Sequence, residues 1–309
     1  MKTKIARVLL PSLLLILSSS PAFPGVKRIA AVGDSWAALM THPLAGNVLQ
    51  TALVDRGFPD VEILASDETV VPGSSADQWA ANHKGKLDRL RRALEANPEV
   101  DIAFVVIGGN DFLREARKRK LSMLTAEQRA RLWFGIRTNI ETLVTTILSC
   151  RPNLKVVLCD YDYLNLEALS KPPFNQKLMG ISQSDLNHYL VELGRQKLRI
   201  AQNSNRVLYV NNWGLMQHFL AVPESEHGSA KFPRPGAPPH YTPFAGGDPT
   251  KPSPAAAFLQ FQVNNGIHLN AEGYKRIIEN ALDQGLASML ATPGTLDYKQ
   301  QPTPKLVRE

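Results

Sequence analysis

The chain has 309 residues and a formal net charge of +7, and 44% of its residues are hydrophobic. This length fits one α/β domain with insertions. The charge pattern argues against a nucleic-acid-binding protein, because no long basic stripe is interleaved with aromatic residues. The one basic cluster, Arg114 to Lys120, is typical of a solvated helix face, with an anionic substrate or a membrane surface as the alternative.

The first 22 residues have the form of a secretory signal peptide. Three basic residues precede an apolar stretch from Val8 to Leu17, and Ser20-Pro21-Ala22 has the small-x-small form of a signal-peptidase site. A stretch of about ten apolar residues is too short to cross a bilayer, which takes about 20. No later segment is longer and equally apolar, so we expect no transmembrane anchor. We predict cleavage after residue 22 and a periplasmic or secreted protein.

Buried strands and amphipathic helices alternate along the rest of the chain. A strand at 26–33 is followed by a helical region to about residue 56 and by a second strand at 61–65. After a loop through Pro72-Gly73-Ser74-Ser75, the pattern predicts one helix over 76–96. This alternation indicates βαβ units, a parallel sheet and helices on both faces. Further strands are predicted at 101–107, 154–158 and 206–210, and further helices around 132–147, 182–202 and 271–289.

The two cysteines are predicted to be unpaired. Cys150 ends a predicted helix, whereas Cys159 lies near the far end of the next strand, about five residues at roughly 3.3 Å each from the strand start. We therefore expect two buried or lightly exposed thiols.

One stretch interrupts the alternation. Residues 223–254 contain nine prolines and show neither a helical nor a strand period, and they are longer than an ordinary connection in a compact domain. A lid or a wall of a substrate site is one interpretation, and a surface excursion without a role is the other. We expect a single domain over 23–291 that contains this insertion, followed by an extended tail at 292–309.

Ser35 lies where the first predicted strand gives way to a helix. It follows Gly33-Asp34, and the glycine permits a sharp bend. The carboxyl edge of a parallel sheet is where α/β proteins place their ligands, close to the backbone N–H groups of a helix start. A serine at this position can act as a nucleophile, and the alternative from this motif alone is a helix N-cap.

Three further segments follow, or lie near, the ends of predicted strands: Gly73, Gly108-Gly109-Asn110-Asp111 and Asn265-Gly266-Ile267-His268. With Gly33-Asp34-Ser35, in this order over nearly the whole mature chain, they resemble the SGNH, or GDSL, hydrolase superfamily. The resemblance implies a flavodoxin-like three-layer α/β/α sandwich with a mostly parallel five-stranded sheet. It also implies hydrolysis of esters of lipids, sugars or small alcohols, or acyl transfer.

The resemblance implies a role for each matching residue. Ser35 would be the nucleophile and His268 the general base, and the oxyanion hole would consist of the Ser35 and Gly73 N–H groups and the Asn110 side-chain amide. The chemistry asks for the same residue types, since acyl transfer by serine needs a base for the hydroxyl proton and donors for the developing oxyanion. Asparagine is a neutral donor that does not titrate, and glycine lets a substrate approach the backbone.

Other catalytic patterns are missing from the sequence. No His-Glu-x-x-His motif or Cys/His cluster is present, so we expect neither a metal nor a cofactor. Ala37 occupies the position of the second glycine of the Gly-x-Ser-x-Gly elbow, which disfavours the α/β-hydrolase fold.

Asn265 departs from the family pattern, which has aspartate three residues before the histidine. The triad is therefore Ser-His-Asn by position, or a Ser-His dyad in practice. If the Asn265 carbonyl oxygen faces Nδ1 of His268, it accepts the hydrogen bond that a carboxylate would accept. The alternative is that Asn265 is only a turn residue.

These observations favour a serine hydrolase that cleaves acyl or acetyl esters of a small-molecule, glycan or lipid substrate. One alternative is an acyltransferase or a deacetylase that acts on a surface polysaccharide. Another is a catalytically weakened binding module on the same fold.

Overall fold

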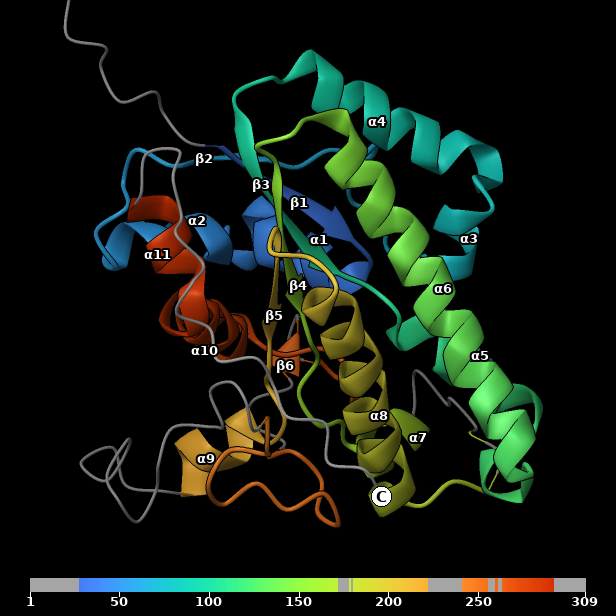
Figure 1. The fold of residues 1–309 in the computed structure, drawn as a ribbon. Coiled ribbons are helices and arrows are strands. Elements are labelled where there is room, and N and C mark those ends of the chain that lie inside the picture. Colours follow the sequence, from blue (N-terminus) through green and yellow to red (C-terminus); the bar gives the residue numbers. More distant parts are fainter. Residues whose placement is uncertain are drawn as a thin grey trace, which may run out of the picture.

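The computed structural model describes residues 28–171, 178, 180–221, 241–254, 259–260 and 263–291 (Figure 1). The predicted signal peptide at 1–22, the tail at 292–309 and the part of the proline-rich insertion at 223–240 lie outside the described residues.

A central sheet of five parallel strands has the order β2-β1-β3-β4-β5. This is the flavodoxin-like strand order, so the predicted fold class is confirmed. The interior strands are apolar runs buried on both faces, as Ile29 to Val32 illustrate. The strands are β1 (Arg28–Gly33), β2 (Glu62–Leu64), β3 (Val100–Val106), β4 (Lys155–Cys159) and β5 (Val207–Val210).

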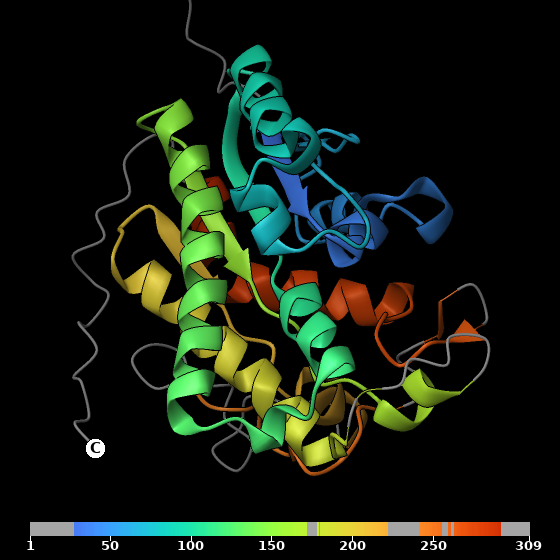
Figure 2. The ribbon, with the colours of Figure 1, turned by 90° about the vertical axis from the view of Figure 1, so that its right-hand side faces the viewer.

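Helices cover both faces of the sheet, which gives three layers (Figures 1 and 2). One layer contains α1 (Ser35–Thr41), α2 (Val48–Asp55), α10 (Ala271–Ala281) and α11 (Ala287–Ala291). The other contains α4 (Lys86–Ala96), α6 (Ala126–Cys150) and α8 (Gln183–Gln202). The remaining helices lie in the connections between these elements: α3 (Ala76–Ala80), α5 (Gly109–Lys118), α7 (Leu166–Ser170) and α9 (Leu215–Ala221).

The single helix predicted over 76–96 is two helices. Asn82 and Lys84 have φ of 50° and 53°, which ends α3 and leads through a short 3₁₀ turn into α4. The Asn82 side-chain oxygen accepts the N–H groups of Leu87 and Asp88 in the first turn of α4. A local side-chain cap therefore starts a new helix where the hydrophobic period alone shows no break.

The terminal helix predicted over 271–289 is also interrupted. A π-helical turn at 282–286 contains Gly285 with φ of 142°. Before α10, β6 (Leu259–Gln260) and β7 (Val263–Asn264) form a short antiparallel pair that the sequence pattern does not predict.

The described part of the proline-rich insertion, residues 241–254, is fastened to the helices beside it. Asn187 of α8 donates to the carbonyl groups of Pro249 and Lys251. Gln217 of α9 donates to the carbonyl group of Asp248 and also reaches those of Lys251 and Pro252. This part of the insertion is therefore built into the layer around α8 and α9.

Cys150 and Cys159 are both free thiols, as predicted, and Cys159 is buried. Within the part of the chain that the structure describes, no helix combines the length and the apolar character that a membrane span requires.

Candidate active site

The turn after β1 places Ser35 at the carboxyl edge of the sheet. Gly33 has φ of 138°, and a Cβ there would lie 1.9 Å from the Val106 carbonyl oxygen of β3, so only glycine fits. Asp34 is the N-cap of α1, because its Oδ1 accepts the Trp36 N–H at 3.0 Å. Ser35 is thus the first residue of the helix and not its cap, and the N-cap alternative for Ser35 is wrong.

The structure brings His268 to Ser35 from 233 residues further along the chain. Nε2 of His268 lies 2.7 Å from Oγ of Ser35. The loop that carries the histidine is held against the start of α7, where the Asn165 N–H donates to the Gly266 carbonyl at 3.0 Å. Gly266 has φ of 72°, and a Cβ there would lie 2.3 Å from the Asn165 carbonyl oxygen. Glycine is therefore required for the close seating of this loop.

Asn265 points its amide nitrogen, and not its carbonyl oxygen, at His268. The Asn265 Oδ1 accepts the N–H groups of Ile267 and His268 at 3.0 and 2.8 Å. Backbone N–H groups can only donate, so they fix which end of the amide faces them. Nδ2 then lies 2.7 Å from Nδ1 of His268. This orientation is opposite to the one in which Asn265 would replace the family's carboxylate.

The protonation of His268 follows from these neighbours. Two donors cannot face one another, so Nδ1 presents its lone pair to the Asn265 amide and the neutral ring carries its proton on Nε2. Burial lowers the pKa of His268 to about 4. Desolvation has this effect because it disfavours the charged imidazolium.

Asn110 and the loop that carries Gly73 lie together at the same edge. The Asn110 amide donates to the Ser74 carbonyl at 2.9 Å. Gly73 is exposed and has φ of 73°. The same loop is bound to the β1 turn, because the Val71 N–H donates to the Gly33 carbonyl at 2.9 Å.

Asp111 is a site-building residue whose role the sequence did not reveal. Its buried carboxylate accepts the N–H groups of Ala76 and Asp77 at 2.7 and 3.1 Å, and so caps the start of α3 across a gap of about 35 residues. Burial raises the pKa of Asp111 to about 6. The only sequence signal was its position directly after Asn110, and nothing in the pattern pairs it with α3.

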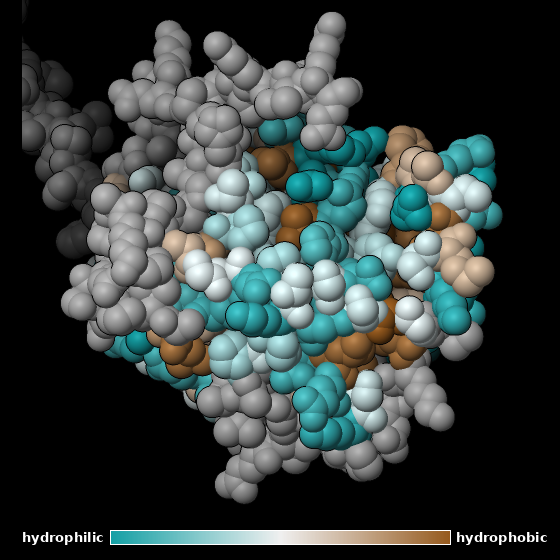
Figure 3. Space-filling model, turned by 90° about the horizontal axis from the view of Figure 1, so that it is seen from below, coloured by the Kyte–Doolittle hydropathy of each residue, from teal (hydrophilic) through white to brown (hydrophobic). Residues whose placement is uncertain are grey.

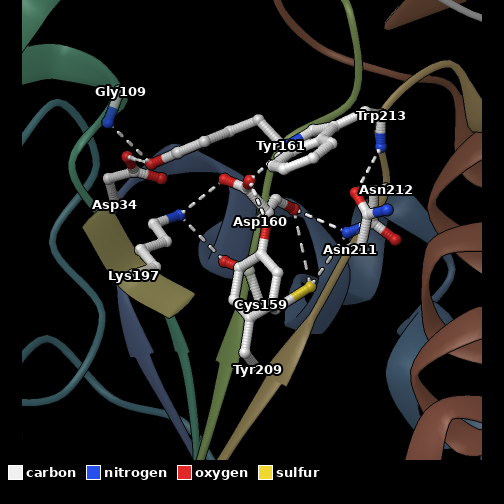
Figure 4. Close-up of polar contacts among 10 residues, drawn as sticks. All are labelled: Asp34, Gly109, Cys159, Asp160, Tyr161, Lys197, Tyr209, Asn211, Asn212 and Trp213. Atoms are coloured by element: carbon white, nitrogen blue, oxygen red, sulfur yellow. Dashed lines mark hydrogen bonds and ion pairs between the residues drawn. The ribbon is translucent and has the colours of Figure 1, made fainter. Parts of the chain in front are cut away.

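Tyr161, which follows β4, is a second residue that sequence reasoning missed (Figure 4). Its hydroxyl donates to Asp34 Oδ2 at 2.5 Å and accepts the Gly109 N–H at 3.1 Å. Burial raises the pKa of Asp34 to about 6, although the bond from Tyr161 opposes this shift. The sequence shows only a tyrosine two residues past a strand, without any signal of its partners.

A small pocket opens beside Ser35 and Asn110. It has about 20 Å³ of room for a water-sized body, and one water needs roughly 10–15 Å³ by this measure. The pocket is therefore nearly filled by its own walls. Apolar side chains line it, among them Leu113, Leu164, Leu190 and Ile267.

A family model described as GDSL-like Lipase/Acylhydrolase matches residues 29–281. The chain belongs to this family. It is accordingly an ester hydrolase of the GDSL type, and the resemblance inferred from the four sequence segments is confirmed. A comparison with curated protein sequences gives no match.

Solved structures similar to this GDSL hydrolase include other esterases and lipases. A carbohydrate acetylesterase from Sinorhizobium meliloti is 15% identical with a TM-score of 0.47, and the match covers 85% of this chain and 99% of that one. A family 3 carbohydrate esterase from Clostridium thermocellum is 16% identical, with a TM-score of 0.44 and coverages of 85% and 97%. An extracellular lipase from Streptomyces rimosus is 12% identical, with a TM-score of 0.46 and coverages of 83% and 98%.

In this GDSL hydrolase the residues singled out from the sequence gather at one edge of the sheet. Ser35, His268 and Asn265 form one hydrogen-bonded chain. Asn110 lines the pocket beside Ser35, and Gly73 lies in the loop bound to the β1 turn. Among the described residues, no group of three or more His, Cys, Asp or Glu side chains is placed to hold a metal ion.

Proposed function

We propose that this GDSL hydrolase is a serine esterase in which Ser35 is the nucleophile and His268 the general base. The observation that carries the proposal is the 2.7 Å contact between Ser35 Oγ and His268 Nε2. That distance is within the range over which a base takes a hydroxyl proton.

In the proposed reaction, Ser35 Oγ attacks the carbonyl carbon of the ester while its proton passes to Nε2 of His268. The Ser35 and Gly73 N–H groups and the Asn110 amide stabilise the oxyanion, and loss of one such donor typically costs about 10²- to 10³-fold in rate. The tetrahedral intermediate collapses, and His268 returns the proton to the departing alcohol. Water then attacks the acyl-enzyme by the same steps, which releases the acid and restores Ser35.

The first proton transfer requires an imidazole that is unprotonated at Nε2. The orientation of Asn265 favours the opposite tautomer, in which Nε2 donates to Ser35. Catalysis therefore proceeds through the minor tautomer with its proton on Nδ1, which must displace the Asn265 amide from its present contact. We infer a working but slow enzyme.

The identity of the nucleophile can be tested with a fluorophosphonate probe, which reacts with activated serine hydroxyls. We expect covalent labelling of the wild type and none of Ser35→Ala. Ser170→Ala, which removes an exposed hydroxyl on α7, is the matched control and should label like the wild type. Equal labelling of Ser35→Ala would exclude Ser35 as the nucleophile.

One observation favours a second candidate function, a binding module with weakened turnover. The amide donor facing Nδ1 of His268 is an arrangement that slows proton transfer. Binding of an acetylated glycan without release of acetate would support this second function over the esterase.

The substrate that we propose is a short acyl ester of a polar alcohol. Figure 3 views the molecule from the side of α9 and residues 241–254, and hydrophobic residues of the described chain form only small separate patches there. On this face the described residues therefore lack the larger apolar patch that an enzyme acting at a lipid surface would use, which favours a polar substrate. A polysaccharide deacetylase or acyltransferase in the periplasm or the medium fits this surface and the predicted signal peptide.

A further inference from the structure

The two turns that would supply the nucleophile and the oxyanion donor are joined by one tyrosine. Asp34 directly precedes Ser35 in the turn after β1, and Gly109 directly precedes Asn110 in the turn after β3. The Tyr161 hydroxyl donates to Asp34 Oδ2 at 2.5 Å and accepts the Gly109 N–H at 3.1 Å. One oxygen atom therefore contacts the immediate neighbours of both residues, as Figure 4 shows.

Besides the two hydrogen bonds of its hydroxyl, Tyr161 has packing contacts that hold its ring. Trp36 packs against it edge to face with ring centroids 5.0 Å apart. The Lys197 ammonium group lies 4.4 Å from the ring centroid. Lys197 is itself fully buried and bonded to Asp160 Oδ1 and to the Cys159 carbonyl, at 3.1 and 3.0 Å. The hydroxyl consequently has little freedom to leave the two turns.

The β3 turn is also shaped to receive this side chain. A Cβ at Gly109 would lie 3.0 Å from Cζ of Tyr161 and 3.2 Å from its hydroxyl oxygen. Any larger residue would push the ring away from the turn. Close packing at Gly109 and the hydrogen bond from its N–H group therefore both hold the tyrosine against this turn.

We propose that Tyr161 is a positioning residue that sets the spacing between Ser35 and the Asn110 oxyanion donor. The inference rests on the proposed roles of Ser35 and Asn110. Donors of an oxyanion hole act only when they are held at hydrogen-bond distance from the position the oxyanion will occupy. A displacement of about 1 Å in such an arrangement can cost about 10²-fold in rate.

The test is Tyr161→Phe, which removes the hydroxyl and retains the ring. Tyr163→Phe is a matched control two residues away, because Tyr163 is equally buried and its hydroxyl has no hydrogen-bond partner among the described residues. Three measurements apply to both variants: kcat and KM on p-nitrophenyl acetate, the rate of fluorophosphonate labelling, and amide hydrogen exchange at residues 33–36 and 108–111. Thermal unfolding verifies that both variants are folded.

We expect Tyr161→Phe to lower kcat and the labelling rate by about 10-fold, with KM within about twofold of wild type. Exchange at both turns should accelerate, while Tyr163→Phe leaves all three readouts unchanged. An unchanged kcat and exchange rate in folded Tyr161→Phe would overturn the proposal, as would equal losses in Tyr163→Phe.

Different results would reject the proposed function and the proposed role of Tyr161. If the wild type itself neither cleaves the ester nor labels, the proposed function is wrong. The exchange measurement then still tests whether Tyr161 holds the two turns, because unchanged protection of both turns in Tyr161→Phe rejects that part of the inference and faster exchange at both supports it.

Discussion

At position 265 the difference between asparagine and the family's aspartate is a single atom of the side chain. The Asn265 oxygen is already occupied by two backbone N–H groups, so its other end decides the tautomer of His268. An aspartate in the same rotamer would keep those bonds with one oxygen and accept the Nδ1–H with the other. The ring would then present its lone pair to Ser35.

We therefore predict that Asn265→Asp raises kcat/KM on p-nitrophenyl acetate by about 10- to 10³-fold, which is less than the cost of about 10⁴-fold seen for the reverse change in a serine protease. Asn265→Ala removes the amide donor without adding an acceptor and should give a smaller gain. Steady-state kinetics measure both effects, and the ¹⁵N shifts of the imidazole report the change of tautomer. No change in rate for either variant would mean that Asn265 does not influence His268.

The pH dependence of kcat/KM gives a second prediction about His268. The neutral imidazole is the active form, and burial lowers the pKa of His268 to about 4, so activity should hold as pH falls and decline only near that value. In Asn265→Asp a carboxylate stabilises the imidazolium and raises this pKa, so the decline should move toward neutral pH. Measurement of kcat/KM between pH 3.5 and 8 tests this. A wild-type decline near the ordinary histidine value of about 6.5 would contradict it.

Helix α8 has a glycine, Gly194, where it packs against the buried ion pair of Lys197 and Asp160. A Cβ on Gly194 would lie 1.9 Å from Asp160 Oδ2 and 2.5 Å from the Tyr209 hydroxyl. That carboxylate oxygen also accepts bonds from Tyr209 and Trp213, at 2.8 and 2.7 Å. The missing side chain thus leaves space for a buried polar network.

Gly194→Ala should lower the free energy of unfolding by about 2–4 kcal/mol, because overpacking and disturbance of the buried pair outweigh the higher helix propensity of alanine. Gly135→Ala in α6 is the matched control, since a Cβ there meets nothing within 4 Å. It should raise the free energy of unfolding by about 0.5–1 kcal/mol. Urea titration measures both changes, and equal effects would show that the space at Gly194 is not needed.

The helices and strands also show which features of the fold could be predicted from the sequence. The strands other than the short edge strand β2 contain continuous apolar runs such as Ile102 to Ile107, so local composition was enough to find them. The break at Asn82 was not visible, because the hydrophobic period continues across it and a side-chain cap decides the break. The Ser35 and Asn110 segments could be placed at one edge from topology alone, because each follows a strand of the central sheet. The His268 segment follows β7 of the separate antiparallel pair, so only the family resemblance placed it beside Ser35. The bonds of Tyr161 and Asp111 join residues far apart in sequence, and no local pattern encodes such pairs.

For the whole molecule, the small pocket and the polar surroundings predict a preference for short acyl groups. The pocket beside Ser35 has about 20 Å³ of room, and Leu190 of α8 forms part of its wall. We expect kcat/KM to be at least about 10-fold higher for p-nitrophenyl acetate than for the octanoate, because a long chain must displace packed side chains.

Leu190→Ala should narrow this ratio by opening the pocket, provided that thermal unfolding shows a folded variant, since such truncations cost about 2–5 kcal/mol. A faster reaction with octanoate in the wild type would refute the preference.

The separation of Ser35 and His268 by 233 residues has a consequence for the order of events during synthesis. The strand β1, the Gly73 loop and the Asn110 turn leave the ribosome early, and His268 emerges only after all five strands. Closing so long a loop is entropically costly and is supported by few local contacts. The docking of Gly266 against Asn165 is thus a late step. By the proposed mechanism, an incomplete chain carries its serine and oxyanion donors but no base, and ester cleavage begins only when the last loop has closed.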